Sequence, residues 1–320
     1  MDDTSPARND AAAQPVILAR GVRKHYGTIH AVDGVDLEVG AGELFGLIGH
    51  NGAGKSTMFK MMLGLIPASA GEIRIDGALV TGAAHGKAGD FRAVRRRVGY
   101  LPENVVLYDN LTGLETLHFF ARLKGVATAG APVLLERVGL AQAAKRRVRE
   151  YSKGMRQRLG FAQALLGNPR ILFLDEPTNG LDPEAIRSFY AILRQLKSEG
   201  VTTVITSHIL AEIQERVDRL AIMTAGKVQA CGTVQALREQ MDLPLWFAVR
   251  VAPPDFEAVR AALGHLPVGA IEARDDHIAV QCRRDAKMAV IAALATLDGK
   301  VQDLTVHEPS LEDVFFGFSD

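Results

Sequence analysis

The chain has 320 residues with 37 basic and 37 acidic side chains, so its formal net charge at neutral pH is zero. This length exceeds an average single domain, and a hydrophobic content of 48% supports a sizeable core and excludes a disordered protein. Balanced charge disfavours a dedicated nucleic-acid binder. Cys231 and Cys282 lie far apart and in no metal-ligand spacing, so neither a disulfide framework nor a zinc site is indicated, and a reducing, cytosolic compartment fits.

The N-terminal residues 1–15 are polar and acidic and lack the apolar stretch of a signal peptide, so we expect a disordered tail there. No apolar run approaches the ~18 residues that a membrane-spanning helix needs. If the protein acts at a membrane, we expect another chain to span it.

Residues 16–242 have the pattern of an α/β domain. Three stretches alternate apolar and polar residues, which predicts half-buried strands, and three are continuous apolar runs, which predict strands buried on both faces of a parallel sheet. These are residues 16–22, 35–39 and 72–75, and residues 44–48, 171–174 and 201–205. Residues 111–149 have helical spacing. We therefore expect a mixed central sheet with an antiparallel β flank and a helical insertion.

Pro244 interrupts this pattern, and we place a domain boundary between residues 242 and 243. The predicted elements beyond it are a strand at 246–251, a helix at 255–263, strands at 268–273 and 277–281, a helix at 284–297 and a strand at 301–306. This βαββαβ order predicts a small α+β, ferredoxin-like domain over residues 243–320. A last helix is expected to begin at Ser310–Asp313, which resembles a capping box.

Residues 49–56, GHNGAGKS, match the phosphate-loop pattern GxxxxGK[ST] and lie between a buried strand and a helical run. Glycines let such a loop wrap so that its amides point at phosphate oxygens. Lys55 is expected to reach the β- and γ-phosphates of a nucleotide, and the Ser56 hydroxyl to hold Mg²⁺. The alternative, a chance glycine loop, is disfavoured by the strand-loop-helix context.

The strand at 171–174 delivers two carboxylates, Asp175 and Glu176, at its C-terminal end, where ligands bind in open α/β sheets. Asp175 suits Mg²⁺, directly or through water, and Glu176 can polarise a water for attack on the γ-phosphate. A solvated acidic pair is the alternative, and the upstream phosphate loop disfavours it.

Residues 151–155, YSKGM, precede a predicted helix at 156–166, and alone they could be a simple N-cap. They occupy the place of the LSGGQ signature of ABC-family ATPases, between the phosphate loop and the acidic pair. Residues 16–232 therefore resemble an ABC ATP-binding cassette. The resemblance implies a D-loop at 179–182, NGLD, and a switch histidine, His208, that senses the γ-phosphate.

The resemblance also assigns the remaining site residues. Tyr26 matches the aromatic residue that stacks on adenine, although a lone tyrosine there would more often end a strand. The implied nucleotide-binding residues are Tyr26, Asn51, Gly52, Ala53, Gly54, Lys55, Ser56 and Thr57; the signature residues that contact the partner's ATP are Ser152, Lys153, Gly154 and Met155, with Asp182 in the D-loop; the catalytic residues are Glu176 and His208; and the Mg²⁺ ligands are Ser56, Glu103 and Asp175.

Glu103 stands in residues 99–105, GYLPENV, where most family members carry a glutamine that joins the Mg²⁺ shell and reports the nucleotide state to the membrane subunit. A carboxylate oxygen is also a good Mg²⁺ ligand. We therefore expect Glu103 to face the metal ion, directly or through water. A solvated turn residue is the alternative.

The family assembles two phosphate loops and two signatures across a dimer, and this chain carries one of each. The resemblance implies a homodimer that binds ATP and Mg²⁺, lies on the cytoplasmic face of the inner membrane beneath integral permease subunits, and binds no nucleic acid. Residues 243–320 are expected to stabilise or regulate the dimer. A soluble ABC ATPase acting on ribosomes or DNA is disfavoured by the single phosphate loop, and a binding module without turnover by Glu176 and His208.

Three stretches, GHNGAGKST, GYLPENV and YSKGMRQRLGFAQALLG, resemble the Nos-type ATPases that serve copper-site assembly in nitrous oxide reductase, beneath a permease with a periplasmic accessory protein. Residues 308–315, EPSLEDVF, resemble the end of the ATPases of the drug- and ion-exporter branch, which is the alternative function.

We expect no copper site within the chain itself. Met58, Met61 and Met62 have the helical spacing of core residues, and His25 and His30 flank a turn with no third ligand nearby in sequence. The basic runs at 95–97 and 145–149 are interpreted as solvated helix faces, with acidic headgroups or the permease as secondary candidates.

Overall fold

The computed structural model describes residues 15–81, 89–240, 244–274, 277–297 and 299–307. Backbone contacts divide the chain into two units, Met1–Gly232 and Thr233–Asp320. This division lies before helix α8 (Val234–Gln240), whereas the sequence pattern places the boundary after that helix, at residue 242. The expected N-terminal tail, apart from Pro15, and the expected helix at Ser310 lie outside the described residues.

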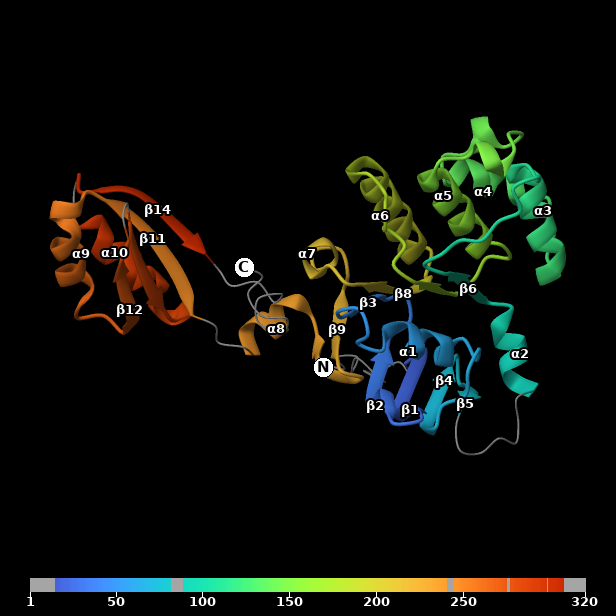
Figure 1. Ribbon diagram of the computed structural model, residues 1–320, viewed down its shortest axis with the longest axis horizontal. Helices are drawn as coiled ribbons and strands as arrows, with labels where there is room; N and C mark the ends of the chain where they lie inside the picture. The colour runs from blue at the N-terminus through green and yellow to red at the C-terminus, as the bar shows by residue number, and fades with distance from the viewer. Residues whose placement is uncertain (1–14, 82–88, 241–243, 275–276, 298, 308–320) are drawn as a thin grey trace, which may run out of the picture. The chain divides into compact units, whose positions relative to one another are not determined.

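A six-stranded sheet runs through the first unit in the order β10-β9-β3-β8-β7-β6 (Figure 1). Its strands are β3 (Leu44–Ile48), β6 (Val98–Leu101), β7 (Ile171–Leu174), β8 (Thr202–Ser207), β9 (Arg219–Thr224) and β10 (Lys227–Gly232). Neighbouring strands are parallel except for the edge pair of β9 and β10. Every residue of β3, β7 and β8 is buried, as the continuous apolar runs predict.

The predicted antiparallel flank is a second sheet in the order β2-β1-β4-β5. It comprises β1 (Ile17–Tyr26), β2 (Ile29–Val39), β4 (Ala70–Ile75) and β5 (Ala78–Thr81). Its apolar residues form one core with helix α1 (Lys55–Met62) and the central sheet. Met58, Met61 and Met62 are fully buried in that core, so the interpretation of these residues as packing residues is confirmed.

Helices α3 (Gly113–Lys124), α4 (Ala131–Arg137) and α5 (Lys153–Ala164) gather beside the β6 end of the sheet (Figure 1). The first is fixed by a capping box between Thr112 and Glu115. The other helices of this unit are α2 (Gly89–Arg95), α6 (Pro183–Ser198) and α7 (Leu210–Ile213). In the described ranges, no helix combines the length and apolar character needed to span a bilayer.

The second unit has the predicted βαββαβ order, with strand order β12-β13-β11-β14 in an antiparallel sheet. The elements after α8 are β11 (Leu245–Val251), α9 (Phe256–Leu263), β12 (Val268–Ala273), β13 (Ile278–Cys282), α10 (Lys287–Ala295) and β14 (Val301–His307). Short 3₁₀ turns at Pro253–Asp255 and Arg284–Ala286 lead into the two long helices. A separate hydrophobic core lies between the sheet and these helices, and it includes Phe247, Val259 and Val290.

The atoms around Gly99 on β6 leave no room for a side chain, and this packing can be tested by substitution. A Cβ there would lie 2.2 Å from the carbonyl oxygen of Ala164 and 2.5 Å from a Leu172 methyl carbon. Because the backbone cannot yield cheaply, Gly99→Ala should destabilise the first unit by about 1–3 kcal/mol, seen as a lower Tm by calorimetry. Gly130→Ala is the control, since its Cβ would meet nothing and its φ is an ordinary −78°. Equal Tm values for the two variants would contradict the packing account.

Candidate functional site

The phosphate loop joins the end of β3 to the start of α1, and two of its glycines are needed for close backbone approach. A Cβ on Gly49 would lie 2.4 Å from the Met223 carbonyl oxygen, and one on Gly54 would lie 2.4 Å from that of Ala31. Gly54 also has a φ of 105°, a conformation that side chains disfavour, and is the N-cap of α1. The loop is therefore held against β9 and β2, with the N-terminus of α1 at its end.

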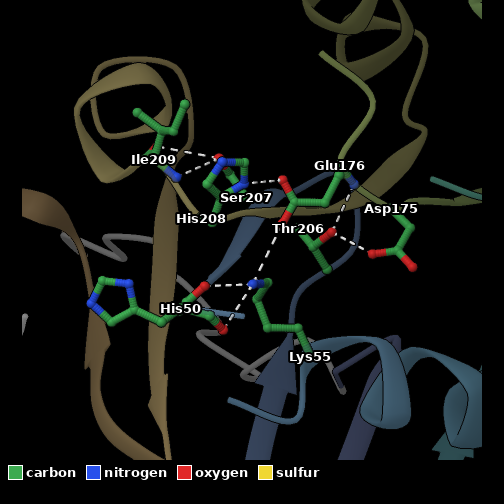
Figure 2. Close-up of polar contacts among 9 residues, drawn as sticks. His50, Lys55, Asp175, Glu176, Thr206, Ser207, His208 and Ile209 are labelled. Carbon is green, nitrogen blue, oxygen red and sulfur yellow. Dashed lines mark hydrogen bonds and ion pairs between the residues drawn. The ribbon is translucent and has the colours of Figure 1, made fainter. Parts of the chain in front are cut away.

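Lys55, the first residue of α1, places a buried ammonium at the centre of the site (Figure 2). Its Nζ donates to the carbonyl oxygens of Gly49 and His50, the latter at 3.3 Å. It also lies 3.4 Å from Oε1 of Glu176, whose side chain is equally buried. A buried cation needs such partners, and these three oxygens supply them.

Glu176 follows β7 and contacts two functional side chains at once. Its Oε2 lies 2.7 Å from Nδ1 of His208, while Oε1 faces Lys55. Its backbone has a φ of 46°, in the left-handed region, and its N–H donates to the Thr206 hydroxyl at 2.8 Å. His208 follows β8 and is partly exposed, beside a turn in which the Ile209 N–H donates to Ser207 Oγ. Figure 2 shows the chain of contacts from Lys55 through Glu176 to His208.

Asp175 lies behind Glu176 and is 4% exposed. Burial raises the pKa of its carboxyl group, and the charge of Glu176 adds to this, whereas hydrogen bonds from Thr206 and Ser56 oppose it. Since the folded pKa is raised, ionisation of Asp175 subtracts from stability as the pH rises through that pKa. A cation bound next to this carboxylate would favour its charged form.

The predicted nucleotide residues line one pocket of about 510 Å³. Its walls include Tyr26, residues 50–57, Glu103, Glu176 and His208. Asp175 lies close to Ser56, which lines this pocket and whose hydroxyl lowers the pKa of the Asp175 carboxyl group. The carboxylates of Asp175 and Glu103, together with burial as the largest cause, raise the pKa of Tyr100 to about 12, which places both acids within electrostatic range of one phenol.

The signature residues and Asp182 do not line this pocket, whereas Asn179, the first residue of the predicted D-loop, does. Ser152 caps α5 by accepting from the Met155 N–H at 3.2 Å, and Asp182 caps α6 by accepting from the Ala185 N–H at 2.8 Å. The two segments lie against each other, because a Cβ on Gly180 would come 2.5 Å from Lys153 Nζ. Within one chain, the residues predicted to act on a partner's nucleotide are therefore apart from the phosphate loop.

Thr206 is a site residue that the sequence reasoning missed. Its hydroxyl donates to Oδ1 of Asp175 at 2.7 Å while accepting from the backbone of Glu176. The apolar run predicts a strand that ends at Ile205, whereas β8 continues to Ser207. The signal available in the sequence was the pair of hydroxyl residues directly before His208.

The comparison with known proteins agrees with this geometry. A sequence model described as ABC transporter matches residues 32–179. Over 316 residues the chain is 34% identical to the daunorubicin resistance ATP-binding protein DrrA3 of Streptomyces coeruleorubidus, a match that covers 95% of each protein. The chain belongs to the ABC transporter family of ATP-binding proteins.

A second relative matches over a similar length, and two solved structures match over a shorter part of the chain. The linearmycin resistance ATP-binding protein LnrL of Bacillus subtilis is 30% identical, over 95% of this chain and 98% of that protein. The structure of an ATP-binding subunit of an ABC transporter superposes with a TM-score of 0.64 at 32% identity, covering 71% of this chain and 93% of the other. A cassette solved as a dimer in a post-hydrolysis state with ADP and Pi gives 0.62 at 26% identity, covering 68% and 98%.

Thr206 offers a test of how this ABC site is held together. Thr206→Val keeps the side-chain shape but leaves the buried Glu176 N–H without its acceptor, which should cost about 1–3 kcal/mol of stability. Loss of a group that orients the two acids should lower ATPase activity about 10–100-fold. Thr206→Ser keeps the hydroxyl and is expected to retain most of the activity. If both variants hydrolyse ATP equally well, the hydroxyl does not orient the acids.

Proposed function

We propose that this chain is the ATP-hydrolysing motor subunit of an ABC transporter, and that a homodimer of it couples ATP binding and hydrolysis to a membrane permease. The observation that carries the proposal is the line of contacts from Lys55 through Glu176 to His208, at the wall of a pocket formed by the phosphate loop. A binding module without turnover would not need a buried acid held between a cation and an imidazole.

Lys55 has two sets of oxygen partners in this proposal. In the structure its ammonium contacts two loop carbonyls and Glu176. The oxygens of the β- and γ-phosphates carry more charge than these partners, so ATP would draw the ammonium away from the carboxylate. Phosphate binding thereby releases Oε1 of Glu176 to accept a hydrogen bond from water.

Glu176 is the proposed general base and His208 the group that positions it. An ionised carboxylate only accepts hydrogen bonds, so Nδ1 of His208 carries the proton in their 2.7 Å contact. That contact fixes one carboxylate oxygen while the other takes a proton from the attacking water. The partly exposed His208 also lines the pocket, where its ring can contact the γ-phosphate.

Ser56, Asp175 and Glu103 are the residues that would hold Mg²⁺. The hydroxyl and carboxylate oxygens fit the hard ligands that this ion prefers, and Ser56 lies close enough to Asp175 to lower the pKa of its carboxyl group. When bound, the ion supplies positive charge that neutralises the β- and γ-phosphates. Tyr26, at the same pocket, is the proposed stacking surface for adenine.

A second copy of the chain is the proposed source of the signature. Ser152, Lys153, Gly154, Met155 and Asp182 lie away from the pocket of their own chain, and a relative of this cassette is a dimer with ADP and Pi. We further propose that the dimer sits on the cytoplasmic face of the membrane beneath the permease. The second unit, which follows a complete cassette, would stabilise or regulate that dimer.

Two candidates remain for the work done through the permease. Export of a small molecule is supported by the relatives named for daunorubicin and linearmycin resistance. Service to copper-site assembly in nitrous oxide reductase, with a periplasmic accessory protein, is supported by the Nos-type stretches that contain His50 and Glu103-Asn104. Two of these three residues, His50 and Glu103, line the nucleotide pocket, and nucleotide binding is common to both candidates. The names of the relatives therefore favour export.

Glu176→Gln tests the motor. It keeps the size of the side chain but removes the base, and should lower kcat about 10²–10⁴-fold while ATP still binds, trapping a dimer visible by size-exclusion chromatography with ATP and Mg²⁺. Lys55→Ala is the matched contrast, because loss of its phosphate contacts should abolish ATP binding itself, measured with a fluorescent analogue. Near-normal turnover in Glu176→Gln would refute the base assignment.

Deletion of the gene in its host separates the two candidates. If the chain powers an exporter, the deletion should sensitise cells to at least one amphipathic antibiotic and leave nitrous oxide reduction intact. Loss of nitrous oxide reduction with unchanged drug sensitivity would instead select the copper-site role. Complementation with the wild-type chain, but not with Glu176→Gln, shows that either phenotype depends on ATP turnover.

A further inference from the structure

The hairpin between β1 and β2 holds two histidines side by side. His25 and His30 are cross-strand partners, and their ring centroids lie 4.2 Å apart with the planes tilted by 44°. Because the two residues are paired across one sheet, the backbone holds their side chains next to each other. A pair of imidazoles fixed in this way is half of a typical transition-metal site.

Asp33 completes the group, which corrects the expectation that no third ligand lies near this pair. The donor atoms of His25, His30 and Asp33 all lie within 4.8 Å of one another. In a regular strand, His30 and Asp33 would face opposite sides of the sheet, because they are three positions apart. Lys24 pairs with Val32 and the next residue, His25, pairs with His30. Ala31 is therefore an extra residue of β2 at this register shift. This bulge turns His30 to the side of Asp33.

His25 also has a donor atom that lacks a partner. Its Nε2 is buried and accepts or donates no hydrogen bond among the described residues. A buried polar atom is costly when unpaired, and a metal–nitrogen bond would satisfy it.

The ion pairs of Asp33 are weak enough for a metal ion to replace one of them. Its Oδ2 lies 3.4 Å from Lys227 Nζ and its Oδ1 lies 3.7 Å from Arg23 Nε, and both cationic side chains are more than half exposed. Exposed pairs of this kind contribute little to stability, so a metal ion can take over one carboxylate oxygen. The two cations oppose a bound metal ion, and therefore set its affinity.

We propose that His25, His30 and Asp33 bind one divalent transition-metal ion of the class that imidazole prefers, with Zn²⁺ as the representative ion. Two nitrogens and one carboxylate oxygen suit such ions in tetrahedral geometry with water as the fourth ligand, whereas Mg²⁺ prefers an all-oxygen shell. The site is distinct from the proposed Mg²⁺ position at Ser56. His30 also lines the nucleotide pocket, so the metal site lies at its wall.

The test is a Zn²⁺ titration of the full-length chain, purified without a polyhistidine tag and without nucleotide, because ATP itself chelates the ion. Calorimetry in competition with a chromophoric chelator should give one tight equivalent per chain that excess Mg²⁺ does not displace. His25→Ala and His30→Ala should each lose this equivalent, and Asp33→Asn should weaken it at least about tenfold. Lys227→Ala should tighten it, since a competing cation is removed.

His265→Ala, an exposed histidine of the second unit, is the matched control and should bind Zn²⁺ as the wild type does. Circular dichroism and the Tm of the metal-free variants check that each is folded. The proposal is overturned if the wild type binds no Zn²⁺ equivalent, or if folded His25→Ala and His30→Ala bind it with unchanged affinity.

Discussion

The buried contact between Lys55 and Glu176 is the constraint on which the first unit depends. An ammonium and a carboxylate that are both less than a tenth exposed need each other and additional hydrogen-bond partners, because neither can be left unpaired away from water. Their contact joins the N-terminus of α1 to the end of β7, two elements far apart in the sequence. The carbonyl oxygens of Gly49 and His50 are the other partners of the ammonium. The backbone conformation of the phosphate loop therefore depends on the charge of Lys55.

The central sheet explains why these groups meet. Strands β3, β8 and β7 are adjacent and parallel, so the segments that follow them emerge at one edge. The loop from β3 brings Lys55, the turn after β7 brings the two acids, and the turn after β8 brings His208. Thr206, near the end of β8, links this strand to the turn after β7. Its hydroxyl donates a hydrogen bond to Asp175 and accepts one from the backbone N–H of Glu176. A short polar network thus spans three strand ends.

Strand positions and the phosphate loop were predictable because each has a strong local pattern. The apolar runs of β3 and β7 match the structure to the residue, and the βαββαβ order of the second unit follows from its alternating strands and helices. Contacts that depend on two distant segments were not predictable in this way. Thr206 reads as one more β-branched residue of a buried strand until its neighbours across the sheet are known.

The face of the sheet on which each side chain lies is also difficult to predict from the sequence. His25, His30 and Asp33 share one side of a sheet only because a bulge adds a residue to β2, and a strand pattern with period two assigns them to different faces. Subfamily assignment met a different limit. Short stretches around the nucleotide pocket resemble Nos-type ATPases, yet these segments handle ATP, which every branch of the family binds.

The backbone of Glu176 adds a consequence for how this position can evolve. Its φ of 46° is comfortable for glycine or asparagine and strained for a glutamate, by about 1–3 kcal/mol. Selection for a more stable fold would therefore tend to remove the acid, while selection for turnover would keep it in the proposed role of general base. A lineage that no longer needed hydrolysis would be expected to drift away from glutamate here early, so the residue at this position serves as a record of whether the ATPase has remained under use.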